Sequence, residues 1–159
     1  MGVGGEKGFA NGQRAAARFS KPCGLALDVD RHLIVADVVN QCIWKVATAK
    51  GRVMMVAGHV GHEGFANGEG AAARFHSPLG ITVDSNNNIL VATTDNHHIW
   101  MIAVAMARVT TVSDSSNAGF LDVVSALFNA PMSLTLDKGN HHQTIAGFSN
   151  VMHLNSCGW

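Results

Sequence analysis

The chain has 159 residues and 47% hydrophobic residues, enough for a folded domain with a sizeable core, which argues against intrinsic disorder. It carries 11 basic and 11 acidic residues, so its net charge would not attract a nucleic-acid backbone or an anionic membrane. We therefore expect neither nucleic acid nor a membrane as its partner.

The first residues, 1–6, have neither the basic start nor the apolar run of a signal peptide. The apolar run at 99–107 is too short to span a membrane, which takes roughly 20 residues in a helix. Without metal-type spacing, we interpret Cys23 and Cys42 as buried structural thiols and Cys157 as a tail thiol, with a disulfide as the less favoured alternative. We expect a cytoplasmic protein without a cofactor.

A repeat with an offset of 56 residues organises the chain. The stretch Gly-Phe-Ala-Asn-Gly at 8–12 returns unchanged at 64–68, and Arg18-Phe19 returns as Arg74-Phe75. A more diverged copy begins at Gly119. Such periods are typical of solenoids and propellers, whose units bury their apolar faces against their neighbours. We divide the single domain 1–159 into repeats at about 8–58, 64–114 and 119–159, the third incomplete.

Each of the first two repeats contains four short apolar runs separated by turn residues, which is the pattern of consecutive antiparallel strands. The predicted strands are 25–28, 33–37, 42–46 and 53–57 in the first repeat, and 81–84, 89–93, 98–103 and 108–112 in the second. Four antiparallel strands per repeat form the blade of a β-propeller. We predict an all-β fold, a partial β-propeller of about three four-stranded blades.

A glycine-rich link at 58–77 joins the first two predicted blades. Its segment Ala71–Arg74 favours one helical turn, and we expect Phe65 and Phe75 to hold the link against the blades. The string Gly-x-Gly-x-x-Ala at 68–73 has the letters of a dinucleotide fingerprint, but that fingerprint works only between a strand and a helix of a βαβ unit, with an acidic residue about 20 residues later. The first repeat reads Gly12-Gln13-Arg14 at this place, so the repeat does not require the second glycine. We expect no nucleotide there.

Several histidines and acidic residues remain as candidate ligands. His59 and His62 are weak candidates for a metal site, although loop histidines without a metal are the favoured interpretation. The acidic residues of the first hairpins provide too few oxygens for calcium. We instead interpret the turn residues as hydrogen-bonding, blade-stabilising groups: Asp28, Asp30, Asp84 and Asp137 in the first turn, and Asp37, Asn40, Asp95 and Asn96 in the second.

Residues 78–99 resemble the NHL repeat. They read Pro-x-Gly-Ile-x-Val-Asp, then Ile-x-Val-Ala, and then Asn96-His97 in the position that names the family. The Gly-Phe-Ala-Asn-Gly link is similar to that of a long-period subtype, and the resemblance covers nearly the whole chain. It implies a β-propeller, usually six-bladed, that serves most often as a binding platform.

The resemblance has local departures. The first repeat has Asn40-Gln41-Cys42 where Asn-His-Arg is usual, and the third lacks a clear Asn-His pair. The second repeat has His98-Ile99-Trp100-Met101 where Arg-Ile-Arg-Lys is frequent. The cations missing from the first two repeats weaken the RNA binding that the resemblance would otherwise imply. Because only about two and three-quarter blades are present, we expect missing blades or a second copy to complete the propeller.

We expect a non-catalytic scaffold or adaptor that binds a protein partner. The alternatives are an RNA-binding propeller and a propeller enzyme, either a metal-dependent lyase or a hydrolase. The candidate interaction residues are Trp44, Trp100, His97 and His98. Because the two tryptophans recur at one strand position, inter-blade core is the favoured interpretation of them.

Overall fold

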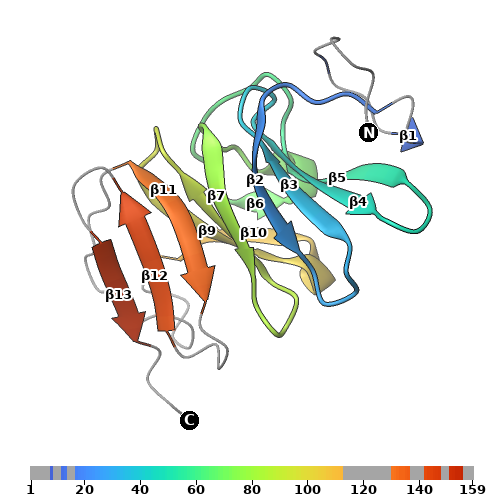
Figure 1. The fold of residues 1–159 in the computed structure, drawn as a ribbon. Coiled ribbons are helices and arrows are strands. Elements are labelled where there is room, and N and C mark those ends of the chain that lie inside the picture. The colour runs from blue at the N-terminus through green and yellow to red at the C-terminus, as the bar shows by residue number, and fades with distance from the viewer. Residues whose placement is uncertain are drawn as a thin grey trace.

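The computed structural model describes residues 8, 12–13, 17–112, 130–136, 142–147 and 151–155. These form three antiparallel sheets, which we call blades 1, 2 and 3 (Figure 1). Blade 1 contains β1 (Gly12–Gln13), β2 (Pro22–Leu27), β3 (Leu33–Asp37), β4 (Cys42–Ala47) and β5 (Arg52–Gly58). Blade 2 contains β6 (Gly68–Glu69), η1 (Gly70–Ala72), β7 (Pro78–Val83), β8 (Ile89–Thr93), β9 (His98–Ala103), η2 (Val104–Met106) and β10 (Arg108–Thr111). Blade 3 contains β11 (Pro131–Leu136), β12 (His142–Gly147) and β13 (Val151–Asn155).

The predicted all-β architecture is confirmed, with one addition to each complete blade. Four strands run outward in chain order, β2 to β5 in blade 1 and β7 to β10 in blade 2, as the repeat predicted. The link before each blade supplies a fifth, two-residue strand at the outer edge, where Gly12 pairs with Val53 and Gly68 with Val109. The four predicted strands of each complete blade are confirmed, and the short strand from the link is added to them. The extra strand covers part of an edge that would otherwise expose unpaired backbone groups.

The first strands of the blades lie next to one another, with β7 between β2 and β11. Glycine makes this approach possible. A Cβ on Gly24 would lie 2.0 Å from the carbonyl oxygen of Leu79, and one on Gly80 would lie 2.8 Å from that of Met132. We call the face of a blade that packs on the preceding blade its leading face, and the opposite face its trailing face.

Apolar side chains fill the space between the blades. The largest cluster joins blades 1 and 2 and includes Ile43, Phe75 and Trp100. A smaller cluster joins Leu90 of blade 2 to Leu134 of blade 3. A further cluster lies on the leading face of blade 1 and contains Trp44, with Ala17 and Phe19 from the link. The link therefore completes the outer part of the leading face in blades 1 and 2.

Trp44 and Trp100 are both fully buried. The ring of Phe19 meets Trp44 edge to face at a centroid distance of 5.7 Å, and Phe75 meets Trp100 in the same way at 5.3 Å. Both tryptophans belong to the core, which confirms the favoured interpretation and contradicts the alternative that placed them on an interaction surface. Phe75 holds the link against the blade as predicted.

The two described cysteines are free thiols in different environments. Cys42 is buried, and its burial together with the nearby charge of Asp37 raises the pKa of its thiol to about 12. Cys23 is exposed at the start of β2, which corrects the prediction that it is buried. Cys157 lies outside the described residues.

Candidate interaction surface

The link 59–77 and the β8–β9 turn meet at one end of blade 2. Pro78 at the start of β7 pairs with Thr93 at the end of β8, which in turn pairs with His98 at the start of β9. The link and the turn therefore project from the same end of the sheet. We call this region, which carries His59, His62, His76, His97 and His98, the histidine-rich end of blade 2.

An asparagine side chain attaches the link to the turn in both complete blades. The Nδ2 of Asn96 donates a 2.6 Å hydrogen bond to the carbonyl of Gly64, and the Nδ2 of Asn40 donates a 2.9 Å bond to the carbonyl of Gly8. Each asparagine thus binds the first residue of the Gly-Phe-Ala-Asn-Gly stretch in its own repeat. These two bonds hold the start of the link against the turn in blades 1 and 2.

The residue after Gly64 is an exposed aromatic ring with a fixed setting. Phe65 is 56% exposed, yet its ring lies 4.6 Å from that of His98 and 5.1 Å from that of Trp100, measured between centroids. The buried Trp100 supports Phe65 from beneath, and the anchored Gly64 fixes the backbone on one side. Aromatic rings held in this way have little side-chain entropy left to lose on binding.

The second-turn acids take different roles in the two blades. Asp37 is buried and accepts hydrogen bonds from the backbone N–H of Ser20, at 2.9 Å, and from the Nδ2 of Asn40, at 2.8 Å. Burial raises the pKa of Asp37 despite these bonds. In blade 2 Thr93 occupies the same position, accepting a bond from the Nε1 of Trp100 at 2.9 Å. Asp95 lies at the surface, where its carboxylate accepts a bond from the hydroxyl of Ser77.

The residue that follows Asn40, and the one that follows Asn96, each connect their blade to the next one. The Oε1 of Gln41 accepts a 2.8 Å bond from the backbone N–H of Ser77, at the entry to blade 2. The Nδ1 of His97 accepts a 2.9 Å bond from the backbone N–H of Ala130, at the entry to blade 3. Although His97 is exposed, its ring is therefore already engaged in an inter-blade contact.

The histidine-rich end also carries acidic groups. The Nε2 of His76 lies 3.4 Å from a carboxylate oxygen of Glu63 and 3.6 Å from one of Asp95. His59 and His62 stack edge to face with their ring centroids 4.6 Å apart, and the Nδ1 of His59 lies 3.3 Å from the carbonyl oxygen of Ala71. Among the described residues, no carboxylate or thiol joins these two rings in a ligand group.

The geometric cluster best suited to a cation lies in the β2–β3 turn. The ligand atoms of Asp28, Asp30 and His32 all lie within 4.8 Å of one another. The Nζ of Lys45 already lies 2.7 Å from the Asp28 carboxylate, which also accepts a 2.7 Å bond from the backbone N–H of His32. We therefore assign this turn a structural role.

Blade 2 repeats that turn with a different set of partners. Asp84 accepts bonds from the backbone N–H of Asn88 at 2.7 Å and from its side chain at 2.9 Å. The contacts of Asp28 and Asp84 agree with the turn-stabilising role predicted for them. The equivalent Asp137 lies outside the described residues.

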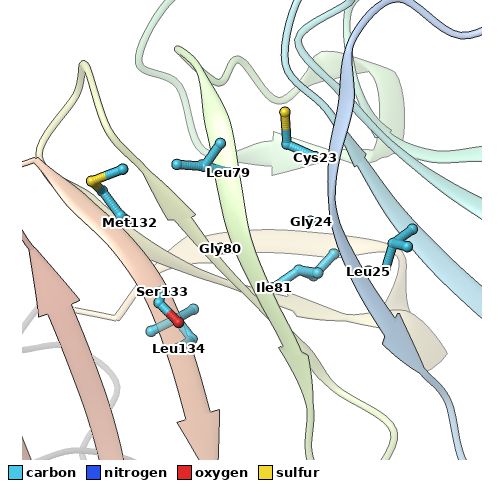
Figure 2. Close-up of a pocket in the computed structure, with 9 residues that line it drawn as sticks. All are labelled: Cys23, Gly24, Leu25, Leu79, Gly80, Ile81, Met132, Ser133 and Leu134. Atoms are coloured by element: carbon cyan, nitrogen blue, oxygen red, sulfur yellow. The ribbon is translucent and has the colours of Figure 1, made fainter.

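A shallow groove of about 320 Å³ follows the first strands of the three blades (Figure 2). The described residues that form it are Cys23, Gly24, Leu25, Leu79, Gly80, Ile81, Met132, Ser133 and Leu134. Acid–base catalysis needs positioned titratable groups. Among the described residues that line the groove, only Cys23 has an ionisable side chain. The groove thus has none of the carboxylate or histidine groups expected of a hydrolase or lyase site.

Sequence reasoning identified His97 and His98 but missed Phe65 as a surface residue. Phe65 was expected to serve, like Phe75, only to hold the link. The two phenylalanines differ because Phe75 is buried in the space between blades 1 and 2, whereas Phe65 packs against His98 and stays exposed. The repeated Gly-Phe pair indicated that Phe65 has a defined place in the repeat. No sequence pattern indicated whether the ring of Phe65 or that of Phe75 would be buried.

A family model described as NHL repeat matches residues 19–46 and 75–101, once in each complete blade. NHL repeat-containing protein 2 of Homo sapiens is 28% identical over 162 residues, covering 94% of this chain and 22% of that protein. The protein SUPPRESSOR OF QUENCHING 1, chloroplastic, of Arabidopsis thaliana is 29% identical over 108 residues, covering 65% of this chain and 10% of that protein. The chain thus spans a small part of the length of these relatives.

Two solved structures share the fold. A structural genomics protein of unknown function from Bacteroides thetaiotaomicron has a TM-score of 0.72 at 18% identity, with 91% of this chain and 38% of that chain covered. An auxiliary nutrient binding protein from Bacteroides ovatus has a TM-score of 0.70 at 18% identity, with 91% and 40% covered. Within the part of the chain that the structure describes, no helix is long and apolar enough to cross a bilayer.

Proposed function

Because this chain belongs to the NHL-repeat family, we propose that it is a non-catalytic propeller module that binds a protein partner at the histidine-rich end of blade 2. The observation that carries this proposal is the setting of Phe65, a ring that is 56% exposed yet packed on His98 and above the buried Trp100. Aromatic anchors of this kind dominate the binding energy of protein interfaces.

The surroundings of Phe65 suit a protein partner. His76, Glu63 and Asp95 provide ionisable groups at the same histidine-rich end, in keeping with the polar rim of a protein interface. The bond from Asn96 to Gly64 holds the loop before binding, which lowers the ordering cost that a partner must overcome. With 11 basic and 11 acidic residues in the chain, attraction to an RNA backbone is a weaker explanation.

We place the module in the cytoplasm as part of the same proposal. The thiol of Cys23 is free and exposed, and that of Cys42 is free and buried. Unpaired thiols of this kind are usual in a reducing compartment.

The test is affinity capture from extracts of the source organism with three proteins: wild type, Phe65→Ala and Met106→Ala. Met106 is 72% exposed and follows the far end of β9, so it controls for loss of any exposed apolar side chain. We expect a discrete protein that binds wild type and Met106→Ala alike and binds Phe65→Ala roughly tenfold more weakly or worse.

Three outcomes would contradict the proposal. If Phe65→Ala bound the partner as tightly as wild type does, the partner would not bind at Phe65. Steeply salt-dependent binding of single-stranded RNA would favour the RNA-binding alternative. Stoichiometric metal together with turnover would favour the lyase or hydrolase alternative.

A further inference from the structure

A β-turn places His59 and His62 side by side at the start of the link. The backbone N–H of His62 donates a 3.1 Å hydrogen bond to the carbonyl of His59, and Gly61 between them has a φ of 69°. A positive φ at the third residue is characteristic of a type II turn, and glycine adopts it without strain. The turn brings its first and fourth residues together, so the centroids of the two histidine rings lie 4.6 Å apart.

A contact between His59 and the end of the link determines which of its ring nitrogens carries the lone pair. The Nδ1 of His59 lies 3.3 Å from the carbonyl oxygen of Ala71. Because a carbonyl oxygen only accepts hydrogen bonds, Nδ1 carries the proton, and in the neutral ring the lone pair is then on Nε2. Histidines that bind metals commonly donate their other ring N–H to a backbone carbonyl in this way. His59 is therefore arranged to bind a metal through Nε2.

The repeat does not require this pair of histidines. The residues 56 positions before His59 and His62 are Val3 and Glu6, although the glycine between them is present in both repeats. His62 is exposed and His59 is half-buried, so neither ring belongs to the core of the blades. The pair is thus a surface feature of the second repeat alone, and the packing of the propeller does not account for it.

The distance between the two rings suits a cation of square-planar or tetragonal geometry. Two imidazoles in neighbouring positions of such a cation, each with its nitrogen about 2 Å from the metal, have centroids about 4.5 Å apart. Zinc sites have three or four protein ligands, whereas among the described residues no third ligand group joins His59 and His62. Cu²⁺ and Ni²⁺ take nitrogen and oxygen ligands in this geometry, and Cu²⁺ binds them more tightly.

We propose that His59 and His62 form a two-histidine binding site for Cu²⁺ on the link that precedes blade 2, with water in the remaining coordination positions. The turn supplies the spacing of the two rings, and the carbonyl of Ala71 holds the ring of His59 in the tautomer that the metal needs. The inference rests on these contacts and is independent of the partner proposed for Phe65.

The experiment titrates the full chain with Cu²⁺ alone. Calorimetry gives the affinity, and NMR of the histidine rings at a substoichiometric amount of Cu²⁺ shows which rings lie nearest the ion, because the ion broadens their signals. The variants are His59→Ala, His62→Ala and the double exchange His59→Val with His62→Glu, which copies the residues of the first repeat. His76→Gln is the matched control, since His76 lies at the same end of blade 2 beside Glu63 and Asp95.

We expect wild type and His76→Gln to bind Cu²⁺ with equal affinity, and the ring signals of His59 and His62 to broaden before those of the other histidines. Each alanine exchange should weaken binding about tenfold or more, and the double exchange should abolish it at this site. Ni²⁺ should broaden the same two signals at higher concentration. Equal Cu²⁺ affinity of wild type and the double variant would overturn the proposal.

The NMR measurement is made on wild type, so the proposal can be refuted even if a variant fails to fold. Earlier broadening of any other histidine ring than those of His59 and His62 would overturn it. Phe65→Ala should bind Cu²⁺ as wild type does, because the ring of Phe65 contacts His98 and Trp100 rather than this pair. The copper site and the proposed function can therefore fail separately.

Discussion

The side-chain amide of Asn96 binds the carbonyl of Gly64 across 32 residues of chain, at 2.6 Å. The same contact joins Asn40 to Gly8 in blade 1. The signature asparagine of each complete blade therefore fixes the start of the link that leads into that blade. In blade 2 this is also the backbone that carries Phe65, so one hydrogen bond connects blade structure to the proposed binding surface.

Asn96→Ala is expected to lower the free energy of unfolding by about 1–2 kcal/mol, because it removes a partly buried hydrogen bond and leaves the Gly64 carbonyl without this donor. Binding at Phe65 should weaken as well, because the loop is no longer held. Chemical denaturation and partner affinity measure the two effects. Asn86→Ala, in an exposed turn of the same blade, is the control and should change stability by less than about 0.5 kcal/mol.

Gly24→Ala is expected to cost about 2–3 kcal/mol of unfolding free energy, because its Cβ would lie 2.0 Å from the backbone carbonyl of Leu79. Ser133→Ala is the matched control, since this position of blade 3 already carries a Cβ, and it should be nearly neutral. Equal stability of Gly24→Ala and wild type in denaturant titrations would contradict the described approach of β2 and β7.

The Asp28–Lys45 pair predicts a pH-dependent contribution to stability. Burial raises the pKa of Asp28, but hydrogen bonds from Lys45 and His32 and the charge of Lys45 outweigh it and hold the pKa below its ordinary value. A depressed carboxyl pKa stabilises the fold above the pKa of the unfolded state, about 3.9, and this stabilisation is lost as the pH falls through the folded pKa.

Lys45→Met places in blade 1 the residue found at the equivalent Met101 of blade 2. We expect it to destabilise the protein by about 1–2 kcal/mol at neutral pH, and by progressively less as Asp28 becomes protonated. Carboxyl NMR titration should show the Asp28 pKa rising in the variant. A pKa that stays at its wild-type value would exclude Lys45 as a cause of the depression.

Gln41→Ala is expected to destabilise the chain by about 0.5–1.5 kcal/mol, because the N–H of Ser77 loses its acceptor. Gln41→His, which copies the His97 contact of blade 2, should recover part of that loss at neutral pH. Amide hydrogen exchange at Ser77 reports the contact directly, and exchange that is equally slow in wild type and Gln41→Ala would exclude it.

The 56-residue repeat predicted the strands of blades 1 and 2 because each strand is a distinct apolar run bounded by turn residues. The strand at Gly68–Glu69 was missed because two residues show no periodicity. The sequence favoured burial of Trp44 and Trp100 without establishing it, because the position of a residue in a strand does not show that the link folds back over one face of the blade. The exposure of Cys23 and Phe65 likewise depends on packing between segments far apart in sequence.

Site-specific photocrosslinking shows directly whether this propeller module binds a protein through Phe65. A photoreactive phenylalanine analogue is placed at position 65 in one protein and at position 106 in another, and both are irradiated in extracts of the source organism. We expect a discrete protein adduct at position 65 that excess wild-type chain suppresses and excess Phe65→Ala does not. An adduct that forms equally at position 106, or that Phe65→Ala suppresses as well as wild type does, would contradict this expectation.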